Sequence, residues 1–255
     1  MRNLWIICRK ELRSYFVSPV AYLLLTMFAV IFGYFFWNSL GYFLNRSMEA
    51  QFSDDPVPMN INEIVIRPLL ANISVVGLFF IPIITMRLFA EEKRTGTIEL
   101  LVTSPVRDGE IILGKWLAAV LLYFSMMCFS GLSFIYLFRY GNPDWKPLLI
   151  GYLGLLMQAG ALLAVGTFIS TLTRNQIIAG AATFGVCLLL WVLEWVSGFE
   201  TAAWAKVLAY FSVIAHFESF SKGLIDSKDV VFYLSMTILA LFFTARSMES
   251  MRWRS

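Results

Sequence analysis

The chain has 255 residues, of which 59% are hydrophobic and only 15% are charged. Soluble globular domains carry about 25% charged residues, so this composition indicates an integral membrane protein. The formal net charge of +3 is small and dispersed, which gives no reason to expect nucleic acid as a partner. The three cysteines, Cys8, Cys128 and Cys187, are far apart and form no disulfide or metal-binding pattern.

Residues 1–17 are predicted to form an amphipathic helix that lies in the membrane interface. At helical spacing, apolar and aromatic side chains share one face (Leu4, Trp5, Cys8, Leu12, Tyr15 and Phe16), and basic side chains share the other (Arg2, Arg9, Lys10 and Arg13). Ser18-Pro19 should end this helix, because proline cannot continue the hydrogen-bond ladder; the alternative is one continuous helix into the first span. Charges persist to Arg13 and no small-residue cleavage site follows, which argues against a cleaved signal peptide.

Six uncharged runs are candidates to cross a bilayer, which takes about 20 residues; the last run is short, but Asp229 and Arg246 can lie at the two interfaces. They are residues 20–44, 68–86, 116–138, 147–173, 175–193 and 230–245. We therefore predict an all-α membrane protein whose residues 1–255 form a single transmembrane domain.

The distribution of lysine and arginine predicts the orientation of these spans. Basic residues concentrate before the first span, between the second and third, and after the sixth, whereas Asp54 and Asp55 make the first connection on the opposite side acidic. Because basic connections stay in the cytoplasm, both termini and residues 87–116 should be cytoplasmic.

The opposite, outer side contains a long connection, residues 194–229, that is too aromatic for an ordinary loop. Trp195, Phe199, Trp204, Phe211 and Phe220 belong to it, and such residues favour a membrane interface. We expect one or two short helices here, which either dip into the membrane surface or form a lid on the bundle.

Residue types exclude several functional classes. The single histidine, His216, cannot build a catalytic Ser-His pair or a histidine-rich metal site, so we predict no enzymatic activity and no cofactor in this chain. Residues 109–115 resemble a phosphate-binding loop, but Trp116 replaces the hydroxyl residue that holds magnesium.

No span contains a carboxylate of the kind that ion-driven carriers use. Polar residues that lie within the second span are candidates for a translocation path: Asn72, Ser74 and Thr85. The alternative is that they bond one helix to another, as small polar residues in membranes usually do.

The most informative segment is residues 87–116, a charged stretch between two apolar runs. We predict that residues 88–94 extend the second span as a helix, that Gly96 interrupts it, and that Thr97 caps a short helix over residues 98–102. Ser104-Pro105 should end that helix, and Asp108 should cap the next. The side chains of Leu100, Leu101 and Val102 then form a small apolar surface bordered by charged residues. A surface of this kind fits a groove on a partner protein. The alternative is a solvated turn with i,i+4 ion pairs worth about 0.3–0.5 kcal/mol each.

The residues of this segment resemble a known family. Residues 92–106 (EKRTGTIELLVTSPV) and 110–115 (EIILGK) are similar to the cytoplasmic loop of ABC-2-type permeases, the membrane subunits of type V ABC exporters. Residues 212–226 (SVIAHFESFSKGLID) and 230–235 (VVFYLS) resemble the subgroup of gliding-motility-associated and nitrous-oxide-reductase-maturation permeases. The resemblance covers the interfacial helix, the six spans and the loop.

This resemblance implies a permease of the bacterial cytoplasmic membrane, driven by a separate cytosolic ATPase that binds ATP and magnesium. It also implies pairing with a second copy or a similar permease. The ATPase contact would be a coupling helix within residues 96–105, with flanking charges, and the turn at residues 173–176. The residues so assigned are Glu91, Glu92, Arg94, Gly96, Thr97, Glu99, Leu100, Leu101, Ser104, Pro105 and Arg174. An alternative is a subunit that passes ATPase-driven motion to a periplasmic partner bound at residues 194–229, rather than moving a solute.

Overall fold

The computed structural model describes residues 2–52, 60–99, 106–199 and 203–252, in which every regular element is helical. Six helical segments are long and apolar enough to cross a membrane, which confirms the predicted fold class. The main spanning helices are α2 (Pro19–Phe52), α3 (Arg67–Thr85), α6 (Asp108–Tyr140), α7 (Trp145–Leu172), α8 (Gln176–Phe199) and α11 (Ser227–Arg252). A π-helical turn, η1 (Asn62–Ile66), leads into α3.

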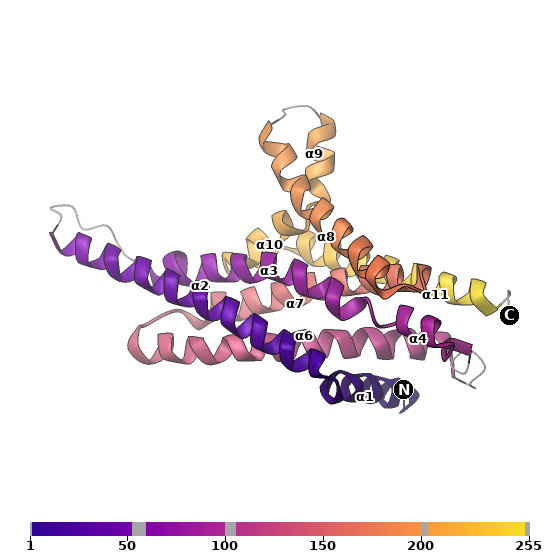
Figure 1. The fold of residues 1–255 in the computed structure, drawn as a ribbon. Coiled ribbons are helices and arrows are strands. Elements are labelled where there is room, and N and C mark those ends of the chain that lie inside the picture. The colour runs from indigo at the N-terminus through magenta and orange to yellow at the C-terminus, as the bar shows by residue number, and fades with distance from the viewer. Residues whose placement is uncertain (1, 53–59, 100–105, 200–202, 253–255) are drawn as a thin grey trace.

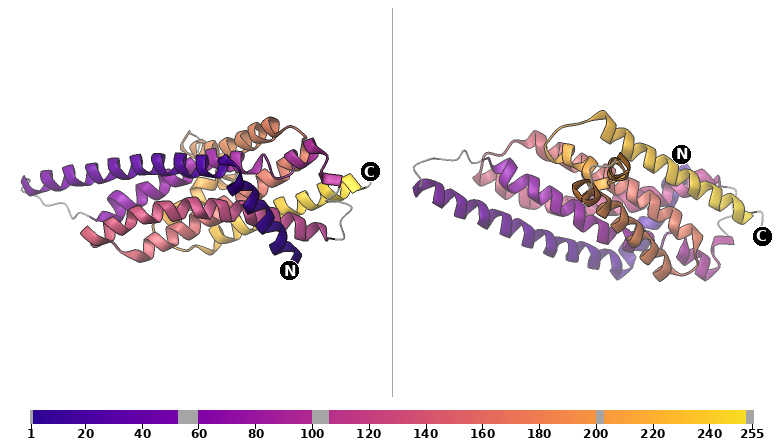
Figure 2. Two further views of the ribbon diagram at one scale, coloured as in Figure 1. Left: turned by 60° about the horizontal axis from the view of Figure 1, so that its bottom comes forward. Right: turned by 90° about the horizontal axis from the view of Figure 1, so that it is seen from above.

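Most of the long helices run along a common axis, and the basic segments gather at one end of the bundle. Figure 1 shows α2, α3, α6, α7 and α11 in this arrangement, with both ends of the chain and α4 (Ala90–Thr95) on the right. α1 (Arg2–Val17) lies at the same end and is inclined to the bundle (Figure 2). The segments for which the sequence predicts a cytoplasmic location therefore share one end of the molecule.

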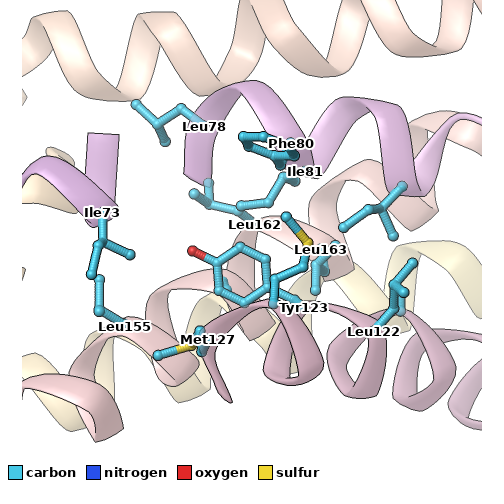
Figure 3. Close-up of a cluster of buried hydrophobic side chains, with 14 of the residues drawn as sticks. Ile73, Leu78, Phe80, Ile81, Leu122, Tyr123, Met127, Leu155, Leu162 and Leu163 are labelled. Atoms are coloured by element: carbon cyan, nitrogen blue, oxygen red, sulfur yellow. The ribbon is translucent and has the colours of Figure 1, made fainter. Parts of the chain in front are cut away.

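The centre of the bundle is built where α3, α6 and α7 meet. Tyr123 and Met127 of α6 pack against Leu162 and Leu163 of α7 and Ile81 of α3, and all five side chains are almost completely buried (Figure 3). The most apolar windows of the second and fourth spans are 61% buried, but that of the α8 span is only 17% buried. α3 and α7 are thus the central helices, and α8 presents most of its apolar surface outward.

Polar side chains in the interior connect neighbouring helices. Ser74 Oγ in α3 donates a hydrogen bond to Gln158 Oε1 in α7 at 2.8 Å, and both residues are buried. Trp116 Nε1 in α6 donates to the Gly160 carbonyl oxygen in α7 at 2.9 Å. Such bonds hold membrane helices together, because lipid tails offer no competing partners.

Two short helices, α9 (Ala203–Tyr210) and α10 (Val213–Ser221), lie between α8 and α11. The Ser212 hydroxyl caps α10 by accepting from the Ala215 amide at 3.3 Å. His216 of α10 connects α9 and α11. Its Nδ1 lies 2.7 Å from Asp229 Oδ1 of α11, and its Nε2 lies 2.8 Å from the Tyr210 carbonyl oxygen of α9. The only histidine therefore has local structural contacts.

Several helices are longer than the uncharged runs from which they were predicted. α2 continues to Phe52 rather than residue 44, and α6 includes residues 108–115 ahead of the uncharged run at 116–138, in line with the expected helix that runs from Asp108 into the third span. A charged residue ends an apolar run, but it does not end a helix. α6 also differs at its first residue: Asp108 was expected as the cap, whereas Arg107 is the cap residue and makes no side-chain capping bond.

We predict that Gly154→Ala destabilises the bundle and that Gly131→Ala does not. A methyl group on Gly154 of α7 would lie 2.5 Å from Phe220 Cβ, so α10 must move away from α7. We expect a loss of about 1–3 kcal/mol, which is usual for overpacking. Gly131 in α6 has no atom within 4 Å of the added methyl group, and alanine there should raise stability by up to about 1 kcal/mol. Thermal unfolding of the purified variants in detergent measures both changes, and equal effects would contradict the packing of α10 on α7.

Candidate coupling site

The second span is interrupted at the end from which residues 87–99 emerge. α3 ends at Thr85, residues 86–89 form a turn, and α4 starts at Ala90. The predicted helix over residues 88–94 is therefore confirmed for residues 90–94, but it is not a continuous extension of the second span, because the turn separates it from α3. Ser170 of α7 explains how the turn is tolerated, because its Oγ accepts hydrogen bonds from the Phe89 and Ala90 amides, each at 3.1 Å. These amides would otherwise lack partners in a buried setting.

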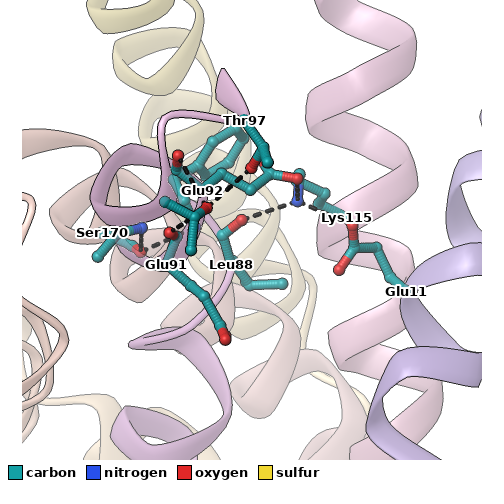
Figure 4. Close-up of polar contacts among 10 residues, drawn as sticks. Glu11, Leu88, Glu91, Glu92, Thr97, Lys115 and Ser170 are labelled. Atoms are coloured by element: carbon teal, nitrogen blue, oxygen red, sulfur yellow. Dashed lines mark hydrogen bonds and ion pairs between the residues drawn. The ribbon is translucent and has the colours of Figure 1, made fainter. Parts of the chain in front are cut away.

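A single buried lysine binds the other side of this turn (Figure 4). Lys115 of α6 is only 1% exposed, and its Nζ donates to the Leu88 carbonyl oxygen at 2.8 Å. The same nitrogen lies 2.9 Å from Glu11 Oε1 of α1 and 2.9 Å from Glu92 Oε1 of α4. An ammonium group has three hydrogens, and these three oxygens use them all. We call Lys115, Glu11, Glu92 and Leu88 the Lys115 cluster; it joins α1, α4, α6 and the α3–α4 turn.

Sequence reasoning placed Lys115 among the cytoplasmic charges and missed this role. One signal was present: Glu11 is the only carboxylate before Glu49, and it lies in an otherwise basic helix. A lone carboxylate of this kind needs a cation from elsewhere in the fold when it is buried. Nothing in the sequence indicated which cation would supply it.

α1 is fastened along its length to the bundle. Cys8 and Tyr15 are buried, the Tyr15 hydroxyl donates to the Ile84 carbonyl oxygen at 2.8 Å, and Gly114 lets α1 approach α6 closely. The predicted single apolar face is divided, because Trp5 is 58% exposed and Phe16 is 37% exposed. One apolar strip of α1 therefore packs against α6, and a second strip, which includes Trp5 and Phe16, is exposed on the surface.

α4 is also tied to the C-terminal end of α7, next to the turn at residues 173–176. Lys93 Nζ donates to the Thr171 carbonyl oxygen, and a lysine at this position complements the negative end of the α7 helix dipole. Arg174 lies close enough to interact electrostatically with Lys93. α4, which carries the assigned charges Glu91, Glu92 and Arg94, and the assigned turn at residues 173–176 are thus neighbours.

The assigned residues divide into three groups. Arg94, Gly96, Thr97, Glu99 and Arg174 are exposed at this end of the molecule. Gly96 has φ of +75°, a left-handed conformation that glycine adopts without strain as it ends α4.

Glu91 and Glu92 are half-buried and have internal partners, Arg87 at 3.3 Å and Lys115 at 2.9 Å. Leu100, Leu101, Ser104 and Pro105 lie outside the described residues, as does most of the predicted helix over residues 98–102; residues 98 and 99 are helical.

The three candidate path residues occupy different environments. Ser74 bonds to Gln158, and Thr85 is fully buried with its hydroxyl donating to the Ile81 carbonyl oxygen at 2.9 Å. Asn72 is half-buried and lines a narrow apolar crevice between α2 and α3. Within the described part of the chain, no group of three or more His, Cys, Asp and Glu side chains is placed to hold a metal ion.

We predict that Lys115→Met releases α1 from the bundle. Removing one partner of a buried ion pair costs about 3–5 kcal/mol, because the remaining charges lose their compensation. Cys8 reports the change: it lies on the face of α1 that packs on the bundle and is fully buried, and burial together with nearby Glu11 raises the pKa of its thiol, so it should react slowly with maleimides. In Lys115→Met, Cys8 labelling should accelerate at least tenfold relative to Cys8 of the unchanged chain, measured by peptide mass spectrometry. Lys10→Met, at an exposed position of α1, is the matched control, and unchanged Cys8 labelling in Lys115→Met would contradict the role of the cluster.

Comparison with known proteins bears on this architecture. No curated protein matches the chain significantly. The family described as ABC-2 family transporter protein matches residues 5–248, which extend from the first turns of α1 to the last turns of α11. The match includes all six spans, the α3–α4 turn and the Lys115 cluster. The chain therefore belongs to the ABC-2 family of transporter proteins, as a multi-pass membrane subunit.

Proposed function

We propose that this chain is the permease subunit of an ATP-driven exporter in the bacterial cytoplasmic membrane, moved by a separate cytosolic ATPase. ATP and magnesium would bind to that partner, which docks on α4, residues 96–105 and the turn at residues 173–176. The supporting observation is the bond from Lys93 of α4 to the Thr171 carbonyl oxygen, which lies at the end of α7 just before the turn at residues 173–176. A partner that contacts both segments would therefore act on one joined surface.

The contacts around this surface suggest how motion would reach the membrane. Displacement of α4 acts on α7 through Ser170 and Lys93, and on α1 and α6 through Lys115. Side chains that are packed and hydrogen-bonded in this way move together, since separating them leaves buried polar groups unpaired. The outward apolar surface of α8 suits a second copy or a similar permease, with the pathway between the two subunits.

We predict that Leu101→Asp and Glu99→Arg each abolish stimulation of the partner ATPase by the permease. In Leu101→Asp, the new carboxylate would have to lose its hydration in the partner's groove. In Glu99→Arg, the reversed charge would oppose the charge of the partner's surface, which is complementary to glutamate. The measurement is ATP hydrolysis by the co-purified complex in vesicles, compared with the ATPase alone. Glu249→Arg, an exposed charge reversal in α11 at the same end, should retain stimulation. Wild-type stimulation in both Leu101→Asp and Glu99→Arg would rule out this docking surface.

A second function, transmission of motion to an outer partner, has one observation in its favour. Trp204, Val207 and Tyr210 of α9 are more than half exposed, and α9 stands away from the main bundle in Figure 1. A photo-crosslinking residue at position 204 tests it in intact cells. Capture of one periplasmic protein, lost when ATP is depleted, would favour transmission, and capture of lipid or of a second copy alone would favour the exporter.

A further inference from the structure

A polar cavity of about 300 Å³ lies where α1 gives way to α2, next to the α3–α4 turn. Its polar lining consists of Glu11, Ser14, Ser18, Arg87 and Glu91, and Val17 contributes an apolar edge. The volume is at the lower limit of small-ligand pockets, which range from about 300 to 1,000 Å³. Neither the coupling contacts nor the spans require a cavity here.

The position of the cavity matches the headgroup layer of a membrane. Ser18 directly precedes the first residue of α2, and Arg87 lies two residues after the end of α3, so both mark the same end of neighbouring spans. Polar groups at span ends lie in the interfacial layer outside the hydrocarbon. Val17 lines the cavity and is 76% exposed. Phe16, its neighbour in the sequence, and Tyr22, whose ring contacts Phe16, are 37% and 58% exposed, and these apolar surfaces suit acyl chains.

The cavity carries groups of both charges that retain unused hydrogen-bonding capacity. Arg87 Nε lies 3.3 Å from Glu91 Oε2, and among the described residues no ion pair or hydrogen bond engages its two terminal nitrogens. Glu11 uses one carboxylate oxygen for Lys115, and its other oxygen makes no bond to a described residue. The carbonyl end of α1 adds a partial negative charge. A guanidinium group therefore faces the same space as two carboxylates.

We propose that this cavity binds the headgroup of a phospholipid that carries both a phosphate and a primary ammonium group, such as phosphatidylethanolamine. The Arg87 guanidinium and the Ser14 hydroxyl would hold the phosphate, since arginine pairs with phosphate through parallel hydrogen bonds. Glu11 and Glu91 would accept hydrogen bonds from the ammonium group. A purely anionic headgroup meets two carboxylates that repel it, and a choline headgroup has no N–H to donate.

This site would connect membrane composition to the Lys115 cluster, because Glu11 belongs to both. A bound ammonium group shares the Glu11 carboxylate with Lys115, and the phosphate ties Arg87 to the end of α1. The lipid would therefore fasten α1 to the α3–α4 turn. The inference concerns lipid binding alone and does not depend on the identity of the ATPase or of any transported solute.

The experiment is lipid retention by the purified full chain. Nanodiscs are prepared with equal amounts of phosphatidylethanolamine, phosphatidylglycerol and phosphatidylcholine, and lipids that stay bound to the released protein are identified by native mass spectrometry. We expect one phosphatidylethanolamine per chain. Stepwise methylation of the ammonium group should reduce retention at each step, because every methyl group removes a hydrogen-bond donor. Equal retention of the choline or glycerol lipid would overturn the proposal without any mutation of the protein.

Variants locate the site. Arg87→Gln and Glu91→Gln should each lower retention about tenfold or more, since one charge-assisted hydrogen bond is worth about 1.5–3 kcal/mol. Arg87→Lys keeps the charge but loses the paired donors and should retain an intermediate amount. Arg13→Gln, an exposed arginine of α1 outside the cavity, is the matched control. Unfolding midpoints check that each variant is folded, and equal losses in Arg13→Gln and Arg87→Gln would place the lipid elsewhere.

Discussion

The end of the bundle that holds α1 and α4 depends on the buried ammonium group of Lys115. A charge with 1% exposure is stable only when its partners satisfy it, and here two carboxylates and one carbonyl oxygen do so. These partners come from α1, α4 and the α3–α4 turn, so one ammonium group joins three segments that are distant in the sequence. The lysine thus converts an interfacial helix and a broken span into one connected unit.

The break in the second span shows how membrane proteins tolerate irregular backbone. Where lipid surrounds a chain, every amide and carbonyl group must find a partner within the protein. Ser170 accepts from two amides that the turn exposes, and Lys115 donates to one carbonyl. Both side chains belong to helices that meet at the centre of the bundle, α7 and α6. The turn is therefore fixed to the helices that fill the core, which suits a segment that would transmit force to them.

Much of the architecture was predictable because it follows from local patterns. Uncharged runs predicted six spans, and the family match agrees with the motif at residues 92–106. The break at residues 86–89 was not predictable, because residues 88–94 have ordinary helical sequence and the hydrogen-bond acceptor, Ser170, is some 80 residues away. The roles of Glu92 and Lys93 were likewise hidden: both look like surface charges, yet both have partners inside the chain.

The sequence by itself determined the membrane class, the number of spans and the family, because these depend on composition, run length and a contiguous motif. The tertiary structure decided which charges are free to meet a partner and which are used internally. Charge pairing in a folded chain depends on distance in space, and Lys115 and Glu11 are separated by 104 residues but lie 2.9 Å apart. Only the packing of α1 against α6 brings them together.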